Sequence, residues 1–182
     1  MWLRIHLAIT ALVGLATLAL APDAPAEASI EYSVKAAYLA KLGMFVEWPR
    51  TAFDTPQSPV VLCVAGTDPF GDVLDKLVAG QRVGPRPIVV KRLKIVTRDS
   101  GCAILFAAGS DAQSVDQALQ AVSGTGVLTV TDDAAVHEAG IIDFVLQEGR
   151  VRFTIDSRAA AENGIVLSSH LLDLALAIKP RA

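Results

Sequence analysis

Val60-Val61-Leu62-Cys63-Val64-Ala65, an unbroken apolar run, is followed at once by the turn-rich stretch Gly66-Thr67-Asp68-Pro69-Phe70-Gly71. In the segment after it, Val73, Leu74 and Leu77 recur at the spacing of a helix face. A short apolar run bounded by turn residues is typical of a buried strand, and a strand followed by a helix is half of a βαβ unit. This stretch therefore predicts an α/β fold.

The same alternation continues on both sides of this unit. Residues 33–46 are predicted to form an amphipathic helix with Ser33 as its N-cap, ended by Trp48-Pro49. Lys41 lies near the middle of the apolar stripe of this helix, and its long stem is expected to let the ammonium group reach water. Further helices are predicted at residues 70–78, 112–122 and 167–178, and strands at 59–65, 87–93, 102–107, 127–130, 141–146 and 151–155.

The polar connection Gln147-Glu148-Gly149-Arg150 lies between two apolar runs and predicts a hairpin. Alternating strands and helices predict a sheet that is parallel through its middle, and the hairpin makes it antiparallel near its end. We therefore expect one α/β domain with a mixed sheet of about five to six strands and helices on both faces.

The first 26 residues have the pattern of an export signal. Arg4 precedes a nearly unbroken apolar run from Leu7 to Ala21, and small-residue cleavage sites follow Pro22. The run is shorter than the roughly 20 apolar residues that cross a bilayer as a helix. We expect a signal peptide at residues 1–26, cleaved after Ala26 or Ala28, and an α/β domain at 27–182 in the bacterial periplasm. A retained membrane anchor is the alternative.

Length and charge limit the classes of function. About 155 residues would remain after cleavage, enough for one domain with a single sizeable core. The formal net charge is −3, and the sequence has neither a basic stripe nor a block of like charge. Nucleic acid and anionic membrane surfaces are therefore not expected as partners.

Cys63 and Cys102 are the only two cysteines, and each belongs to an apolar run. In an oxidising periplasm, two cysteines without a third favour one disulfide. Closing a loop of roughly 40 residues would stabilise the fold by about 4 kcal/mol on the chain-entropy estimate. The alternatives are two buried thiols, or neighbouring strands whose Cβ vectors diverge.

Residues with catalytic chemistry are scarce after the signal. Ser168-Ser169-His170 with Asp173 has the residue types of a nucleophilic triad, but neighbours on one helix point about 100° apart and cannot form a relay. A serine N-cap followed by a solvent-facing histidine is the simpler interpretation.

Metal and phosphate sites are also poorly supported. His137-Glu138, and His170 with Asp173, have no third ligand at a recognisable spacing. Asp132-Asp133 lacks the periodicity of a calcium loop. The stretch that opens at Gly66 lacks a P-loop lysine, and an N-cap Asp68 with Pro69 at the first helical position explains it. The residues alone predict no catalytic, cofactor-binding or metal site.

The chain resembles the YfiR family of periplasmic proteins in an ordered set of short strings that spans the predicted mature protein. They are Val34-Lys35-Ala36-Ala37-Tyr38-Leu39, Phe45-Val46-Glu47-Trp48-Pro49, Cys63-Val64-Ala65-Gly66, Asp68-Pro69-Phe70-Gly71, Cys102-Ala103-Ile104-Leu105-Phe106, Leu128-Thr129-Val130-Thr131-Asp132, Gly140-Ile141-Ile142-Asp143-Phe144, Val151-Arg152-Phe153-Thr154-Ile155-Asp156 and Leu167-Ser168-Ser169-His170-Leu171-Leu172-Asp173-Leu174-Ala175. The resemblance implies that the family's paired cysteines are Cys63 and Cys102.

The resemblance also implies a regulator rather than an enzyme, without a cofactor. The best-known family member represses a membrane-bound diguanylate cyclase, and thereby cyclic-di-GMP signalling and biofilm formation, until an outer-membrane lipoprotein sequesters it. We accordingly expect this chain to bind an inner-membrane diguanylate cyclase or another membrane sensor protein. An outer-membrane lipoprotein and a second copy in a homodimer are further candidate partners.

Such a partner is expected to contact exposed apolar residues, for which Phe45, Trp48 and Phe144 are candidates. A redox switch at Cys63 and Cys102 is an additional hypothesis. Two other classes stay open. One is a periplasmic small-molecule binding domain that feeds a membrane sensor, and the other is a hydrolase that depends on His170.

Overall fold

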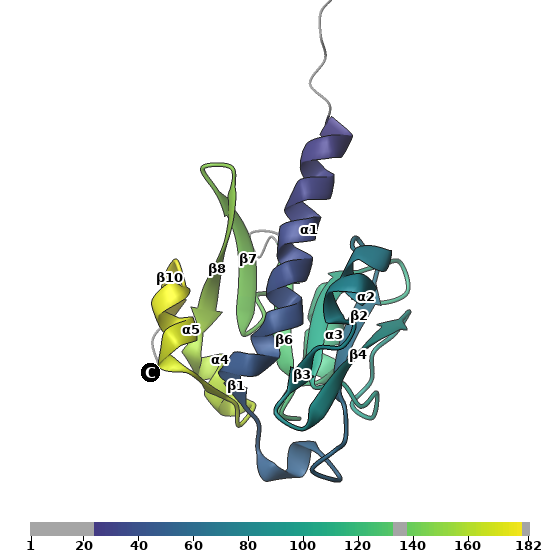
Figure 1. The fold of residues 1–182 in the computed structure, drawn as a ribbon, viewed down its shortest axis with the longest axis vertical. Coiled ribbons are helices and arrows are strands. Elements are labelled where there is room, and N and C mark those ends of the chain that lie inside the picture. Colours follow the sequence, from purple (N-terminus) through teal and green to yellow (C-terminus); the bar gives the residue numbers. More distant parts are fainter. Residues whose placement is uncertain (1–23, 133–137, 180–182) are drawn as a thin grey trace, which may run out of the picture.

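A computed structural model describes residues 24–132 and 138–179, so the predicted signal peptide lies largely outside the described residues (Figure 1). None of the helices in these two ranges is long and apolar enough to cross a membrane. The elements in chain order are α1 (Ala24–Leu42), η1 (Gly43–Phe45), β1 (Val46–Glu47), η2 (Arg50–Ala52), β2 (Val60–Gly66), α2 (Asp72–Val78), β3 (Arg82–Val83), β4 (Arg86–Leu93), β5 (Ile104–Gly109), α3 (Val115–Ala121), β6 (Leu128–Asp132), β7 (Ile142–Gln147), β8 (Arg150–Asp156), α4 (Ser157–Glu162), β9 (Val166–Leu167), α5 (Ser169–Leu174) and β10 (Ala177–Lys179).

The central sheet has eight strands in the order β10-β8-β7-β6-β5-β2-β4-β3. Strands β4, β2, β5, β6 and β7 are parallel neighbours, whereas β7 and β8 are antiparallel. This confirms the expected α/β domain and mixed sheet. Glu148 and Gly149 both have positive φ at the β7–β8 turn, as a type I′ hairpin turn requires. The predicted hairpin is therefore present.

The expected number of five to six strands was too low because two short edge strands extend the sheet. β3 pairs antiparallel with β4 over two residues, and β10 pairs parallel with β8 over three. Elements this short have no periodicity of their own, and their pairing with a longer strand defines them.

The predicted helix at residues 167–178 was wrong for the same reason. This segment holds the end of β9, helix α5 and strand β10, and β9 pairs with β1 in a separate two-stranded sheet. The six-residue helix α4 was not predicted. Asp156 caps it by accepting a hydrogen bond from the Ala159 amide at 2.8 Å.

Side chains alternate along β2 between two hydrophobic cores. Leu62 and Val64 belong to the larger core, which includes residues of α1 and α2. Cys63 and Ala65 belong to the smaller core, which includes residues of α3. Helices therefore cover both faces of the sheet, as expected.

Two helix starts differ from their predictions. α1 begins at Ala24 rather than at Ser33, and the Ser33 hydroxyl donates to the Ser29 carbonyl one turn earlier at 2.7 Å. Asp68 does not cap α2, because Gly71 at φ 52° precedes the first helical residue. Asp68 instead closes a local turn by accepting from the Phe70 amide at 2.8 Å. Lys41 is exposed on the last turn of α1.

Gly66 provides a test of close backbone packing between β2 and β5. It has φ 93°, and a Cβ there would lie 2.2 Å from the Gly109 carbonyl oxygen. Gly66→Ala is expected to destabilise the protein by about 2 kcal/mol in urea unfolding, because strain and a clash combine. Gly80→Ala is the control, with φ 74° and no atom within 4 Å of its Cβ. It should cost only about 1 kcal/mol, and an equal loss at the two sites would contradict the clash.

Candidate functional site

Phe144 is fully buried and has no surface to offer a partner. Its ring centroid lies 5.9 Å from that of Tyr38 on α1, and Phe153 on β8 lies 5.7 Å from the same ring. The expectation that Phe144 is an exposed contact is corrected, because its side chain fills the core between α1 and the β7–β8 hairpin.

Phe45 and Trp48, the other two predicted contact residues, lie away from the contact between Tyr38, Phe144 and Phe153, and both are partly buried. The Trp48 indole donates to the Ala103 carbonyl at 3.3 Å and packs edge-on against Phe53 at 5.6 Å. Phe45 lies 5.8 Å from the exposed ring of His170. The structure therefore does not bring the three predicted residues together, and contact through Phe45 or Trp48 stays a prediction.

A different set of apolar side chains is exposed above the Tyr38 contact. Ile30 and Val34 lie two turns and one turn before Tyr38 on α1, and they are 66% and 39% exposed. On the hairpin, Leu146 pairs with Val151 two residues beyond the Phe144–Phe153 pair, and Leu146 is 57% exposed. We call Ile30, Val34, Leu146 and the half-buried Val151 the α1–hairpin surface.

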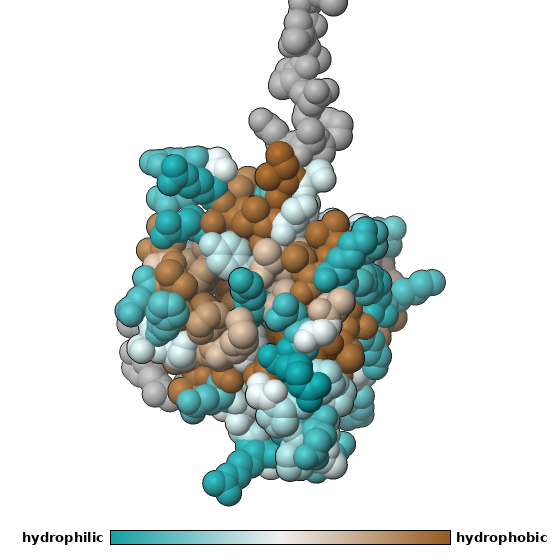
Figure 2. All heavy atoms as spheres, viewed as in Figure 1, coloured by the Kyte–Doolittle hydropathy of each residue, from teal (hydrophilic) through white to brown (hydrophobic). Residues whose placement is uncertain are grey.

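The figures show how this surface is placed. The first turns of α1 and the tip of the hairpin extend beyond the body of the domain at the same end (Figure 1). Figure 2 shows hydrophobic residues gathered along the upper part of α1 and toward the hairpin. Val151 packs partly against the larger core, whereas Ile30, Val34 and Leu146 are exposed apolar side chains, and a group of such side chains can mark a protein contact.

A buried charge cluster fixes α1 next to this surface. Lys35 is only 1% exposed, and its Nζ atom donates to both carboxylate oxygens of Asp132 at 2.7 Å. Nζ also donates to Glu31, one turn earlier on α1, and lies 4.7 Å from the centre of the Tyr32 ring. Because Asp132 ends β6, the cluster ties α1 to the sheet.

The cluster also shifts pKa values. Burial by itself would lower the pKa of Lys35, but hydrogen bonds to Asp132 and Glu31 outweigh it, and the net pKa is raised. Burial and the negative charge of Asp132 raise the pKa of the Tyr32 hydroxyl. Lys35 is therefore held as a cation, and its charged hydrogen bonds to Asp132 hold α1 against the sheet.

Sequence reasoning missed this cluster, although it considered Asp132-Asp133 as part of a calcium loop. The available signals were the i,i+4 spacing of Glu31 and Lys35 and an acidic residue at a strand end. Neither signal shows that the helix and the strand meet. Asp133 lies outside the described residues.

The predicted disulfide is present. Cys63 and Cys102 are joined with a Cα–Cα distance of 5.7 Å, within the usual range for a disulfide. Cys63 is fully buried in the smaller core, beside residues of α3. The bond therefore links β2 to the start of β5 beneath α3.

The remaining catalytic and metal candidates have structural roles or are not described. Ser168 caps α5 by accepting from the Leu171 amide at 3.2 Å, and His170 is exposed, as the N-cap interpretation expected. Among residues 24–132 and 138–179, no three His, Cys, Asp or Glu side chains gather as metal ligands. His137 lies outside these ranges.

The described residues form a small α/β domain with an internal disulfide and with exposed apolar side chains on α1 and on the β7–β8 hairpin. The chain is a member of the YfiR/HmsC-like family, whose model matches residues 32–176. Proteins of this family are periplasmic and regulatory rather than catalytic. A comparison with curated proteins found no match.

Proposed function

We propose that this chain is a non-catalytic periplasmic regulator. It binds the periplasmic sensor region of an inner-membrane signalling protein and represses it, and family membership makes a diguanylate cyclase the first candidate. Two features support the proposal: the disulfide, which suits an oxidising compartment, and the α1–hairpin surface, which has the apolar character of a protein contact.

The α1–hairpin surface is the observation that carries the proposal. A regulator shifts a two-state partner only through a difference in affinity for the two states. Raising the population of one partner state from 1% to 99% takes a difference of about 5.5 kcal/mol between the binding free energies of the two states. Exposed Ile30 and Leu146 can contribute by apolar burial, and the Lys35 cluster keeps α1 in a fixed position against the sheet.

The experiment that tests this function is a measurement of intracellular cyclic-di-GMP in a deletion strain, its parent and a complemented strain. Deletion of a repressor should raise cyclic-di-GMP, and plasmid-borne protein should restore the parental level. Unchanged cyclic-di-GMP on deletion would count against a repressed cyclase and direct attention to another membrane sensor.

Leu146→Glu is expected to abolish most of the repression, because it places a charge within an apolar contact. Ile95→Glu is the matched control, since Ile95 is 52% exposed but lies in the segment after β4. Both variants should unfold at the wild-type temperature, since neither residue is in the core. Cyclic-di-GMP in the complemented deletion strain measures repression. Equal repression by the two variants would exclude Leu146 from the contact.

The redox-switch hypothesis has a separate test. If the Cys63–Cys102 bond controls partner affinity, reductant should change co-purification of the membrane partner with the otherwise folded regulator. Equal affinity with and without reductant would eliminate the switch. Because Cys63 is fully buried, a thiol assay must show that the bond is reduced in the folded protein under the conditions of this comparison.

A periplasmic small-molecule binding domain is the second candidate function. A pocket of about 410 Å³ is lined by Trp48, Phe53 and Arg86 among others, and the Arg86 guanidinium lies 3.8 Å from the Phe53 ring centre. Aromatic walls with a few polar groups are common in ligand sites. A metabolite that raises the unfolding temperature of wild-type protein, but not of Trp48→Ala, would favour this function.

A further inference from the structure

The outer edge of β8 is covered over only part of its length. β10 pairs with β8 from Thr154 to Asp156, and the Leu176 amide donates to the Phe153 carbonyl at 2.8 Å. No other strand within residues 24–132 and 138–179 pairs with this edge. The first four residues of β8, Arg150 to Phe153, therefore form an open edge next to the hairpin turn.

The antiparallel ladder determines which backbone groups face this edge. Alternate residues of a strand direct their N–H and C=O groups to the same side. Because the Phe153 carbonyl points toward Leu176, the Phe153 amide and both backbone groups of Val151 also point outward. These three groups have no partner in the described ladder and can receive another strand.

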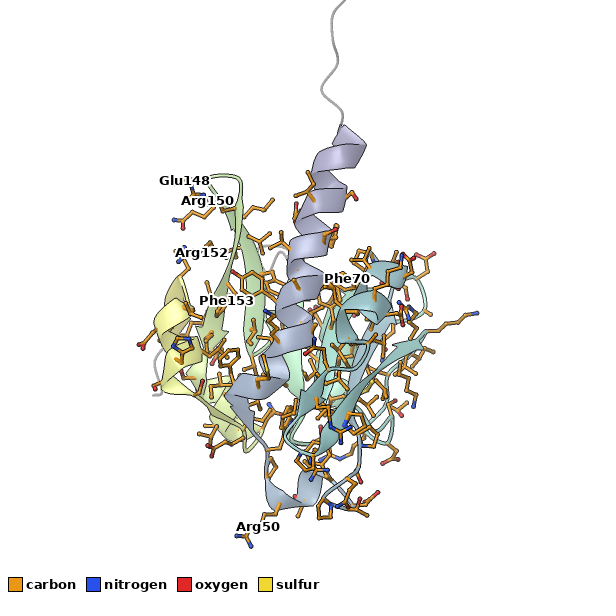
Figure 3. All side chains as sticks on the ribbon, viewed as in Figure 1. Arg50, Phe70, Glu148, Arg150, Arg152 and Phe153 are labelled. Atoms are coloured by element: carbon orange, nitrogen blue, oxygen red, sulfur yellow. A yellow bond between two sulfur atoms is a disulfide. The ribbon has the colours of Figure 1, made fainter. Side chains whose placement is uncertain are left out.

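The two faces of β8 beside this edge carry different side chains, apolar on one face and basic on the other. Val151 pairs with Leu146 on the face toward α1, whereas Arg150 and Arg152 belong to the opposite face of the strand. Both arginines are exposed and project from the outer side of the hairpin, away from α1 (Figure 3). Neither has an ion-pair partner among the described residues.

We propose that the open edge of β8 binds an extended segment of the partner in which acidic and apolar residues alternate. The segment adds a strand in line with β10. Its backbone pairs with Val151 and Phe153, its apolar side chain lies beside Val151, and its acidic side chains face Arg150 and Arg152. The identification of that partner as a membrane sensor rests on the proposed function.

Charge favours this occupant over a second copy of the chain. Two β8 edges paired antiparallel would place the arginines of one copy close to those of the other. Like charges across a strand pair are destabilising, and charged edge residues are a common protection against self-pairing. The same arginines attract the acidic side chains of an incoming strand.

A direct test uses the intact domain and a blocked hexapeptide of alternating aspartate and valine. With millimolar peptide, the amide signals of Val151 and Phe153 should shift in NMR spectra and their hydrogen exchange should slow. The matching lysine–valine hexapeptide should have no such effect. Absence of a shift, or equal shifts with the two peptides, would overturn the proposal.

Backbone pairing and charge can be separated by variants. Val151→Pro removes the outward N–H, whereas Val151→Ala removes most of the side chain but keeps this donor. The proline variant should lose the peptide response and the alanine variant should keep part of it. Both variants should unfold at the wild-type temperature, because the backbone of Val151 faces outward and the hydrogen bonds between β8 and β7 are kept. A full response in Val151→Pro would contradict strand addition.

The cellular test uses Arg150→Glu with Arg152→Glu. In the deletion strain this double variant should lose about tenfold or more in partner affinity and therefore most of the repression. The control is Lys94→Glu with Arg98→Glu, an equal charge change at exposed positions after β4, which lies five strand spacings, or about 24 Å, from β8.

The two proposals fail in different ways. If deletion raises cyclic-di-GMP and the Arg150–Arg152 double variant represses as well as wild type, the regulator stands and the β8 edge is not its contact. If deletion leaves cyclic-di-GMP unchanged, the proposed function fails, and the peptide titration alone decides whether the edge accepts an acidic strand.

Discussion

Lys35→Met is expected to lower the free energy of unfolding by about 3 kcal/mol, which corresponds to about 6–12 °C in unfolding temperature for a protein of this size. Methionine keeps most of the apolar volume of lysine but removes the charge. The carboxylates of Asp132 and Glu31 then face each other without a cation, and their side chains are only 19% and 22% exposed. Thermal and urea unfolding measure the loss.

The matched control is Lys76→Met on α2. Lys76 forms the same i,i+4 type of pair, with Asp72, but both side chains are about three-quarters exposed. Exposed pairs are screened by water and salt, so the control should unfold like the wild type. Equal losses in Lys35→Met and Lys76→Met would show that burial does not decide the strength of these pairs.

The Lys35 contribution should also depend on pH in one direction. The folded-state pKa of Lys35 is raised above its ordinary value, so the folded state binds this proton more tightly than the unfolded state. The stabilisation is complete below the ordinary lysine pKa of about 10.4 and is lost as pH rises through the folded value. The raised pKa of Tyr32 acts in the same direction.

We therefore expect the stability difference between wild type and Lys35→Met to be constant between about pH 7 and about pH 9 and to shrink above about pH 10.4. Urea unfolding at several pH values measures this difference. A difference that grew with alkaline pH would reverse the sign and exclude a lysine held as a cation.

The double substitution Cys63→Ala with Cys102→Ala is expected to cost about 4 kcal/mol, or about 8–16 °C in unfolding temperature. The two cysteines are 39 residues apart in the sequence, so the bond removes much of the freedom of the unfolded chain. Removing both sulfur atoms avoids a free thiol in the smaller core. Differential scanning calorimetry in the absence of reductant measures the loss.

Reductant provides the control for this prediction. Dithiothreitol should lower the unfolding temperature of the wild type toward that of the double variant and leave the variant unchanged. If the alanine variant were as stable as the oxidised wild type, native-state strain would have to cancel the loop-closure effect. The redox switch would then gain a thermodynamic basis, because opening the bond would be inexpensive.

Much of the fold was predictable because its information is local. The six longer strands were located to within two residues at each end, since apolar runs bounded by turn residues define buried strands. The hairpin followed from Glu148-Gly149, whose conformation is set by the turn itself. The Cys63–Cys102 bond was predictable because two cysteines allow only one intramolecular pairing.

The candidate surface was less predictable because it depends on contacts between distant segments. Phe144 is apolar whether it faces a partner or Tyr38, and only the packing of α1 on the hairpin shows that it is buried. Ile30 precedes the predicted helix at residues 33–46, and Leu146 is the last residue of a predicted strand. Their exposure together follows from the length by which α1 and the hairpin extend past the core.

The sequence by itself determined the α/β class, the long strands, the hairpin, the disulfide and the family. The tertiary structure decided the short edge strands, the open edge of β8 and the Lys35–Asp132 contact, whose residues are 97 positions apart. The physical reason is that periodicity and turn chemistry act within a few residues, whereas strand pairing and burial of charge are settled only when remote segments meet.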